Sequence, residues 1–282
     1  MYTSYWNLRS SPFLNADSDE LLYPSEQFQE GLARLFYLID QERVAGLVTG
    51  PYGVGKTFLL TALSRRAERI KLPVIRFDAI PDGGLPMARH ILHRIGIQQD
   101  PLTLADALML LQQRCMDGSR GLTRNVLLID EAQYLSSGDG LYLVHFLTNL
   151  RIRTANGEKP LFTIVLSGTP DLATQVREYE SLRRRIQLSW TLPPLTAAQT
   201  TEYITQHVRA VGGDTWIFTV DALATIHRIT GGIPRSINNL CDTALMLGYA
   251  AQARHITPDL VEEAAVDTGL LLDEDPDNHA QP

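Results

Sequence analysis

Residues 50–57 read GPYGVGKT and constrain this chain more than any other stretch of its sequence. Glycine, four residues, glycine, lysine and then serine or threonine is the pattern of a loop that cradles nucleotide phosphates. Its glycines let backbone N–H groups face phosphate oxygens, Lys56 reaches the β- and γ-phosphates, and the Thr57 hydroxyl is a ligand for Mg²⁺. Apolar residues precede the loop and a helical pattern follows it, as this motif requires. The segment predicts binding of ATP with Mg²⁺.

A second motif supplies the acidic half of a magnesium site. Residues 126–129 are an apolar run typical of a strand buried on both faces, and Asp130 and Glu131 follow it. Asp130 is the candidate that holds the Mg²⁺ hydration shell, and Glu131 is the candidate that polarises the attacking water, so we expect hydrolysis. The predicted nucleotide contacts are Gly50, Pro51, Tyr52, Gly53, Val54, Gly55, Lys56, Thr57, Phe58 and Asp130, with Thr57 and Asp130 at the metal.

Short apolar strands alternate with helical patterns as far as residue 192, which is typical of a parallel sheet sandwiched by helices. The expected strands are residues 44–49, 74–78, 125–129, 161–166 and 187–192, and the expected helices are residues 25–41, 56–70, 85–95, 103–117 and 141–154. Four amphipathic helices follow without strands, at residues 196–211, 219–229, 234–250 and 257–266. We therefore expect an α/β nucleotide-binding domain over residues 1–193, a small all-helical lid over 194–270 and a disordered acidic tail over 271–282.

Composition and charge narrow the location and the partners. Of the 282 residues 44% are hydrophobic, yet no apolar run approaches the roughly 18 residues of a membrane helix. Residues 1–10 lack the basic and apolar regions of a secretion signal, so we expect a cytoplasmic protein without a membrane span. The net charge of −7 argues against a surface that binds nucleic acid everywhere, although Arg183, Arg184 and Arg185 form a dense basic cluster.

An α/β nucleotide domain followed by an all-helical lid resembles the AAA+ ATPases, and the resemblance implies three further site residues. Thr169, with Ser167 as the second choice, would sense the γ-phosphate. Arg185, with Arg184 as the alternative, would reach the nucleotide of a neighbouring subunit. Arg235, after a Gly-Gly-Ile-Pro turn, would couple the lid to the nucleotide. Simpler interpretations stay open, because a threonine can cap a helix, arginines can form a solvated or nucleic-acid-binding face, and Arg235 can merely start a helix.

Seven short motifs make the resemblance more specific. They are YWNL at residues 5–8, SPF at 11–13, LYPS at 22–25, DEAQ at 130–133, SGTPDL at 167–172, LPPL at 192–195 and GIPRSIN at 232–238. Together they resemble the ExeA/GspA family, the general secretion pathway protein A ATPases, along residues 1–270. In that family the N-terminal segment resembles a base-recognition element, which implies that Pro12, Phe13 and Tyr23 contact adenine, with simple packing as the alternative.

The resemblance implies an ATPase that drives assembly or remodelling of a protein partner, works as a homo-oligomeric ring or filament, and serves secretion or envelope assembly. In longer members a membrane span and a cell-wall-binding domain follow the ATPase part, whereas an acidic stretch follows it here. The same ATPase type is similar to DNA-dependent regulators that accompany transposases, so a DNA-associated ATPase of transposition or replication is the alternative. A nucleotide-gated scaffold with little turnover is a third hypothesis, and Glu131 argues against it.

Overall fold

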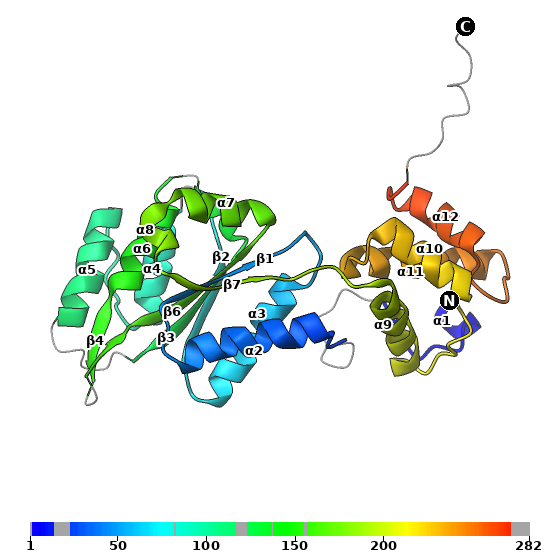
Figure 1. The fold of residues 1–282 in the computed structure, drawn as a ribbon, viewed down its shortest axis with the longest axis horizontal. Coiled ribbons are helices and arrows are strands. Elements are labelled where there is room, and N and C mark those ends of the chain that lie inside the picture. The colour runs from blue at the N-terminus through cyan, green and yellow to red at the C-terminus, as the bar shows by residue number, and fades with distance from the viewer. Residues whose placement is uncertain are drawn as a thin grey trace, which may run out of the picture. The chain divides into compact units, whose positions relative to one another are not determined.

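The computed structural model describes residues 2–13, 23–81, 83–116, 123–136, 138–154 and 157–271. The chain divides into two compact units, of which one is the contiguous segment Glu26–Pro193 and the other combines Met1–Ser25 with Pro194–Pro282. Figure 1 shows a sheet with flanking helices in the first unit and helices alone in the second. Each unit has its own hydrophobic core. The tail expected at residues 271–282 lies, from residue 272 onward, outside the described residues.

A parallel sheet forms the centre of the first unit, with the strand order β2-β3-β6-β1-β7. Thr49 pairs with Gly168, and Asp78 pairs with Asp130, so the carboxyl ends of the strands meet at one edge of the sheet. This arrangement confirms the expected parallel α/β fold. The strands are β1 (Ala45–Thr49), β2 (Val74–Asp78), β3 (Asn125–Asp130), β6 (Phe162–Gly168) and β7 (Ile186–Thr191).

Helices cover both faces of the sheet, as fully apolar parallel strands require. Leu127 and Ile129 of β3 join the larger hydrophobic core, whereas Val126 and Leu128, which alternate with them, are equally buried towards the opposite face. The opposite face carries α2 (Glu26–Asp40) and α3 (Lys56–Arg69) (Figure 1). The helices of the larger core are α4 (Gly84–Arg94), α5 (Leu104–Met116), α6 (Gly140–Asn149), α7 (Pro170–Glu178) and α8 (Glu180–Arg183).

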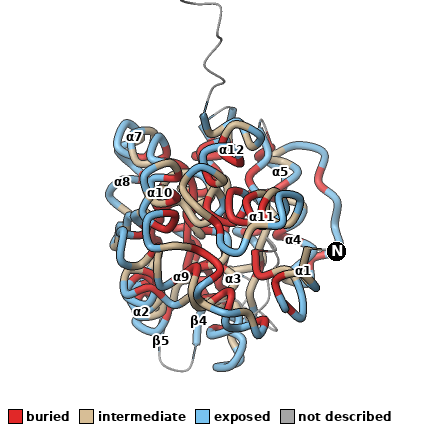
Figure 2. Tube along the Cα trace, turned by 90° about the vertical axis from the view of Figure 1, so that its right-hand side faces the viewer, coloured by how far each residue is buried: buried red, intermediate tan, exposed pale blue. Residues whose placement is uncertain are grey.

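The second unit is all-helical in its described residues, as expected. Buried segments, red in Figure 2, run through its helices, and Leu240, Ala244 and Leu245 are fully buried at its centre. No helix in the described part of the chain is long and apolar enough to cross a membrane. The helices of the second unit are α1 (Tyr2–Tyr5), α9 (Ala197–Ala210), α10 (Val220–Thr230), α11 (Pro234–Ala250) and α12 (Pro258–Asp267).

The N-terminal segment differs from its expected grouping with the nucleotide-binding domain, because it belongs to the helical unit. Trp6 and Phe13 are buried in the helical core, and the indole Nε1 of Trp6 donates a hydrogen bond of 2.9 Å to the carbonyl of Leu245. The ring of Phe13 stacks on that of His207, and the Tyr23 hydroxyl donates to Glu202 at 2.7 Å. Within its unit, Phe13 therefore has a packing role, and a contact between this segment and adenine stays a prediction.

The helix expected at residues 141–154 is wrong in its last part. α6 ends at Asn149, and β4 (Arg151–Thr154) then pairs antiparallel with β5 (Gly157–Pro160) in a separate two-stranded sheet. Ile152 is buried between the arginines on either side of it, an alternation that favours a strand. The dipeptide Asn-Gly at residues 156–157 is a turn signal that disfavours a continued helix, and its Gly157 is the first residue of β5.

Replacement of Trp6 by alanine tests whether the N-terminal segment stabilises the helical unit. We expect Trp6→Ala to lower the free energy of unfolding by about 3–5 kcal/mol, because a buried indole and its hydrogen bond are lost. Urea denaturation followed by circular dichroism measures this change. Trp216→Ala is the control, since the Trp216 side chain is exposed and its loss should cost little. Equal effects of the two substitutions would contradict the packing role of Trp6.

Candidate functional site

The loop between β1 and α3 has the backbone shape that its glycines predict. Gly53 and Gly55 have φ angles of 77° and 107°, in the left-handed region that side chains disfavour. At Gly50 a Cβ would lie 2.6 Å from the carbonyl oxygen of Leu192, so this position leaves room for hydrogen only. Gly55 is the N-cap of α3 and brings no capping side chain. The loop thus presents the positive end of a helix at the edge of the sheet, which is a favourable site for phosphate.

Lys56 places a positive charge inside this loop. Its side chain is buried, and its Nζ donates hydrogen bonds of 2.9 Å to the carbonyls of Gly50 and Pro51. The same ammonium lies 5.6 Å from the centre of the Tyr52 ring. A buried ammonium that the loop carbonyls hold in place is a suitable partner for phosphate oxygens.

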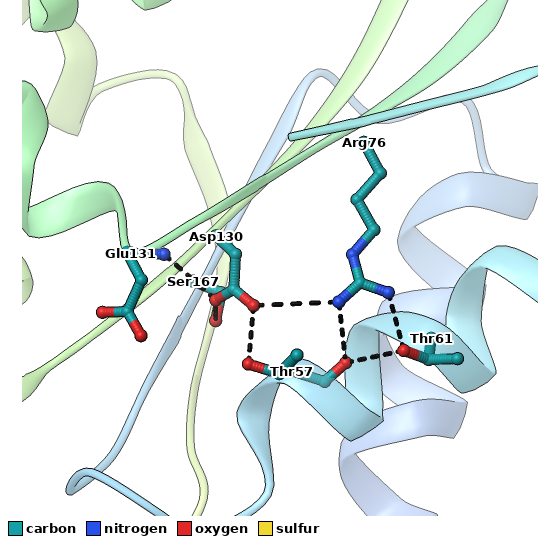
Figure 3. A network of polar contacts seen from close by, with 6 residues as sticks. All are labelled: Thr57, Thr61, Arg76, Asp130, Glu131 and Ser167. Atoms are coloured by element: carbon teal, nitrogen blue, oxygen red, sulfur yellow. Dashed lines mark hydrogen bonds and ion pairs between the residues drawn. The ribbon is translucent and has the colours of Figure 1, made fainter. Parts of the chain in front are cut away.

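Asp130 receives hydrogen bonds from three different segments (Figure 3). Its Oδ2 accepts from the Thr57 hydroxyl at 2.8 Å, and its Oδ1 accepts from the Ser167 hydroxyl at 2.8 Å and from the backbone N–H of Glu131 at 3.1 Å. The carboxylate is only 1% exposed. These contacts join the start of α3 and the ends of β3 and β6, so the two halves of the motif predicted from sequence meet.

The pair of Thr57 and Asp130 suits a magnesium ion. A hydroxyl and a carboxylate are hard oxygen donors, which Mg²⁺ prefers, and Mg²⁺ is usually held by one or two carboxylates together with phosphate oxygens and water. The described residues contain no cluster of three or more histidine, cysteine or acidic side chains that would suit a metal held by protein alone. Thr57 and Asp130 would therefore supply two oxygen ligands to a Mg²⁺ ion whose remaining ligands are phosphate oxygens and water.

Arg76 is a member of this site that the sequence analysis missed. From β2, its Nη1 donates to the Thr61 hydroxyl at 2.6 Å, and its Nη2 donates to the Thr57 carbonyl at 3.3 Å and lies 4.0 Å from Asp130 Oδ2 (Figure 3). The guanidinium thus compensates part of the Asp130 charge and holds the first turn of α3. An arginine between the apolar residues Ile75 and Phe77 of β2 is the signal that could have identified it.

Glu131 adopts a backbone conformation that is rare for its residue type. Its φ angle is 49°, and Figure 3 shows its carboxylate apart from the network around Asp130. The carboxylate accepts a hydrogen bond of 2.5 Å from Nε2 of Gln133, in the short 3₁₀ helix η2 (Ala132–Ser136). Left-handed backbone costs a glutamate about 1–2 kcal/mol and is found where a site over-determines the conformation. The adjacent carboxylates therefore have separate surroundings.

The two hydroxyls considered for γ-phosphate sensing have different environments. Ser167 already donates to Asp130, as described above, and is fully buried. The Thr169 hydroxyl is buried without a hydrogen-bond partner among the described residues, and although Thr169 is the N-cap of α7, its side chain makes no capping bond. Since β6 lies between β1 and β3, both residues are between the phosphate loop and Glu131.

The predicted arginines lie outside this cluster. Arg185 directly precedes β7, and its Nη2 donates to Asn149 Oδ1 at 2.5 Å. The register pairs Ile186 with Ala45 at the amino end of β1, so about 17 Å of strand separates Arg185 from its own phosphate loop. Arg183 and Arg184 are exposed and pair with Glu180. Arg235 is exposed in the first turn of α11, in the helical unit, and its contact with nucleotide stays a prediction.

Ser167 and Thr169 allow a matched test of the network. We expect Ser167→Ala to lower the free energy of unfolding by about 1.5–3 kcal/mol, because a buried carboxylate loses a hydrogen bond. Thr169→Val removes a hydroxyl without a partner and should be nearly neutral. Urea denaturation of both variants measures the difference, and a larger loss for Thr169→Val would contradict the described network.

The sequence is similar to known proteins along most of its length. Residues 39–176 match the family described as AAA domain. The chain is 31% identical over 277 residues to General secretion pathway protein A of Aeromonas hydrophila, which covers 97% of this chain. This chain spans 50% of the length of that relative.

Solved structures show the same fold at low sequence identity. Drosophila ORC bound to DNA matches with a TM-score of 0.69 and 18% identity over 92% of this chain and 64% of that one. The Aeropyrum pernix ORC2 protein matches with a TM-score of 0.64 and 17% identity over 91% of this chain and 71% of that one. The Thermotoga maritima RuvB Holliday junction branch migration motor matches with a TM-score of 0.55 and 17% identity over 90% of this chain and 72% of that one. The phosphate loop, the parallel sheet and these matches together show that this chain has the AAA+ P-loop fold and that its sequence is similar to about half of General secretion pathway protein A.

Proposed function

We propose that this protein binds ATP with Mg²⁺ and hydrolyses it to drive assembly or remodelling of a protein partner. The observation that carries the proposal is the hydrogen bond between Thr57 and Asp130, because it joins the phosphate loop to the acidic strand end beside Glu131. Membership of the AAA-type class supports nucleotide binding. The similarity to General secretion pathway protein A supports a role in secretion or envelope assembly. The cytoplasm is part of the proposal as the place where the protein acts.

Each residue has a defined task in this proposal. Residues 50–58 would hold the phosphates through backbone N–H groups and Lys56. Thr57 and Asp130 would hold Mg²⁺, which would supply positive charge for the γ-phosphate oxygens. Glu131 takes the proton of the attacking water. The Thr169 hydroxyl would donate to a phosphate oxygen, a role supported by its lack of a partner among the described residues. Arg235 would couple the helical unit to the nucleotide.

Two substitutions separate binding from hydrolysis. We expect Lys56→Ala to abolish ATP binding, since the positive charge inside the loop is lost. Glu131→Gln should keep the affinity for ATP within a few-fold while turnover falls about 10²–10⁴-fold, because only water activation is lost. Fluorescent-nucleotide titration and phosphate release measure the two effects. Unchanged affinity in the first variant, or turnover that survives in the second, would refute the corresponding role.

Arg185 supports a homo-oligomer, a ring or a filament, as the working form. It lies at the end of the sheet opposite to its own phosphate loop, so only another subunit could bring such a residue to a γ-phosphate. Arg185 lies close to Arg151 and His145, which also carry or can take up positive charge. Burial, followed by the charge of Arg185, lowers the pKa of both Arg151 and His145. Because these positive groups repel one another, an acidic group from a neighbouring subunit would stabilise Arg185.

A mixing experiment tests this arrangement. Arg185→Ala subunits should bind ATP normally and hydrolyse it poorly, and turnover per wild-type subunit should rise with protein concentration. Mixing Arg185→Ala with Glu131→Gln subunits should restore activity, because some interfaces then combine an intact Glu131 with an intact Arg185. Arg184→Ala is the matched control, since its side chain is 74% exposed and pairs with Glu180. If Arg184→Ala, and not Arg185→Ala, hydrolyses ATP poorly and is rescued by Glu131→Gln subunits, the role belongs to Arg184. Activity that is independent of protein concentration, with no rescue of either variant, would refute the role for both arginines.

Binding to DNA is the second candidate function. Arg183 and Arg184 are exposed beside Arg185, and a structural relative is described as bound to DNA. Glu180 partly neutralises the cluster, so the first proposal is favoured. Comparison of turnover with and without double-stranded DNA at two salt concentrations distinguishes them, since binding through arginines weakens steeply with salt. Strong stimulation by DNA that is lost in Arg183→Ala would favour the DNA-associated function.

A further inference from the structure

The side chain of Gln133 makes three polar contacts beside Glu131, and no role above depends on it. It is nine-tenths buried in η2. Its Nε2 donates to Glu131 Oε2 at 2.5 Å and lies 3.2 Å from the Tyr52 hydroxyl, while its Oε1 accepts from the backbone N–H of Thr169 at 3.2 Å. One amide therefore connects the phosphate loop, the turn after β3 and the loop after β6.

The surroundings of Gln133 fix which way its amide points. The backbone N–H of Thr169 can only donate, so the atom that faces it has to be the amide oxygen. The amide nitrogen must then face the Glu131 carboxylate, which can only accept while it is ionised. The resulting hydrogen bond is charge-assisted and stronger than a neutral one. Neither partner tolerates the reversed amide, so the side chain holds the carboxylate in one orientation.

Two backbone features make room for this contact. A Cβ at position 168 would lie 2.5 Å from Gln133 Oε1 and 2.9 Å from the Leu172 side chain, so Gly168 is needed for the amide to approach Thr169. At Glu131 the φ angle of 49° turns the chain so that residues 131 and 133 can meet two positions apart. The left-handed backbone at Glu131 and the glycine at position 168 both allow this contact, which indicates that the fold specifies it.

Tyr52 extends the network to the phosphate loop. It lies between Pro51 and Gly53, and its ring is 57% exposed while its hydroxyl is beside Gln133. A hydrogen bond with Tyr134, followed by burial and the nearby Glu131 carboxylate, raises the pKa of Tyr52, and the hydrogen bond from Gln133 opposes this in part. The Tyr52 hydroxyl accepts a hydrogen bond from the Gln133 amide and keeps its own proton for donation to Tyr134. The loop that would hold phosphate is thus linked to the carboxylate that would activate water.

We propose that Gln133 is a positioning residue, which holds the Glu131 carboxylate in its working orientation and links it to Tyr52 and to the backbone of Thr169. This inference rests on the proposed function, since Gln133 acts only through Glu131. Without the amide, the carboxylate would sample other rotamers, and loss of orientation alone lowers rates substantially.

The principal test is Gln133→Met, which keeps the length of the side chain and removes its hydrogen bonds. We expect kcat for ATP hydrolysis to fall about 10–100-fold, with the affinity for ATP and the circular dichroism spectrum unchanged. In a Glu131→Gln background the same substitution should cause less than about a two-fold further loss, measured by single-turnover hydrolysis, because the residue it acts through is gone. A purely structural role would give the same loss in both backgrounds and would overturn the inference.

Tyr52→Phe tests the link to the loop without disturbing a buried group. It removes one hydroxyl from an exposed ring, and we expect kcat to fall about two- to five-fold with unchanged affinity. Tyr142→Phe is the matched control and should have no effect, because Tyr142 of α6 is similarly exposed and lies outside the network. Equal activities of these two variants would remove Tyr52 from the network and overturn that part of the inference.

The outcomes separate this inference from the proposed function. Turnover that survives in Glu131→Gln alone would refute the proposed role of Glu131, and the role of Gln133 with it. A large loss in Glu131→Gln together with normal kcat in Gln133→Met would refute the inference alone and leave the proposed function standing.

Discussion

The site depends on the buried carboxylate of Asp130 and on the groups that bond to it. A carboxylate that is 1% exposed is stable only when hydrogen bonds and positive charge replace its lost water. Thr57, Ser167 and the backbone of Glu131 provide the hydrogen bonds, and Arg76 lies at 4.0 Å. Because these groups come from different strands and from α3, the charge requirement of one side chain fixes the relative positions of the phosphate loop, the acidic turn and the end of β6.

Adjacent carboxylates can perform separate tasks because the backbone changes direction between them. Asp130 is still paired in β3, whereas Glu131 has left-handed backbone and faces Gln133. In a regular strand the two side chains would point to opposite faces of the sheet, and one would be buried under helices. The turn instead leaves both at the carboxyl edge, where ligands of open parallel sheets usually bind. Local strain is therefore a condition for the chemistry that we propose.

Local patterns predicted the five strands of the parallel sheet, most helices and the turn between β1 and α3, because each depends on neighbours in sequence. Contacts that depend on distant segments were missed. Gln133 meets Tyr52 across 81 positions, Arg76 meets Thr61 across 15, and Trp6 meets Leu245 across 239. A glutamine in a polar turn and an arginine in a short strand are ordinary in sequence, and their roles exist only after the sheet has placed the strand ends together. The grouping of the N-terminal segment failed for the same reason.

The discontinuous make-up of the helical unit has a consequence for biosynthesis. The segment Glu26–Pro193 is contiguous, so it can complete its own core as it leaves the ribosome. The helical unit cannot, because Trp6 and Phe13 are made before the segment Glu26–Pro193 and their partners in α9, α10 and α11 are made after it. Trp6 and Phe13 must then remain without their native partners until synthesis has passed α11. Their closure over such a long sequence separation makes this unit the slower one to fold, and the one that depends most on protection from aggregation during synthesis.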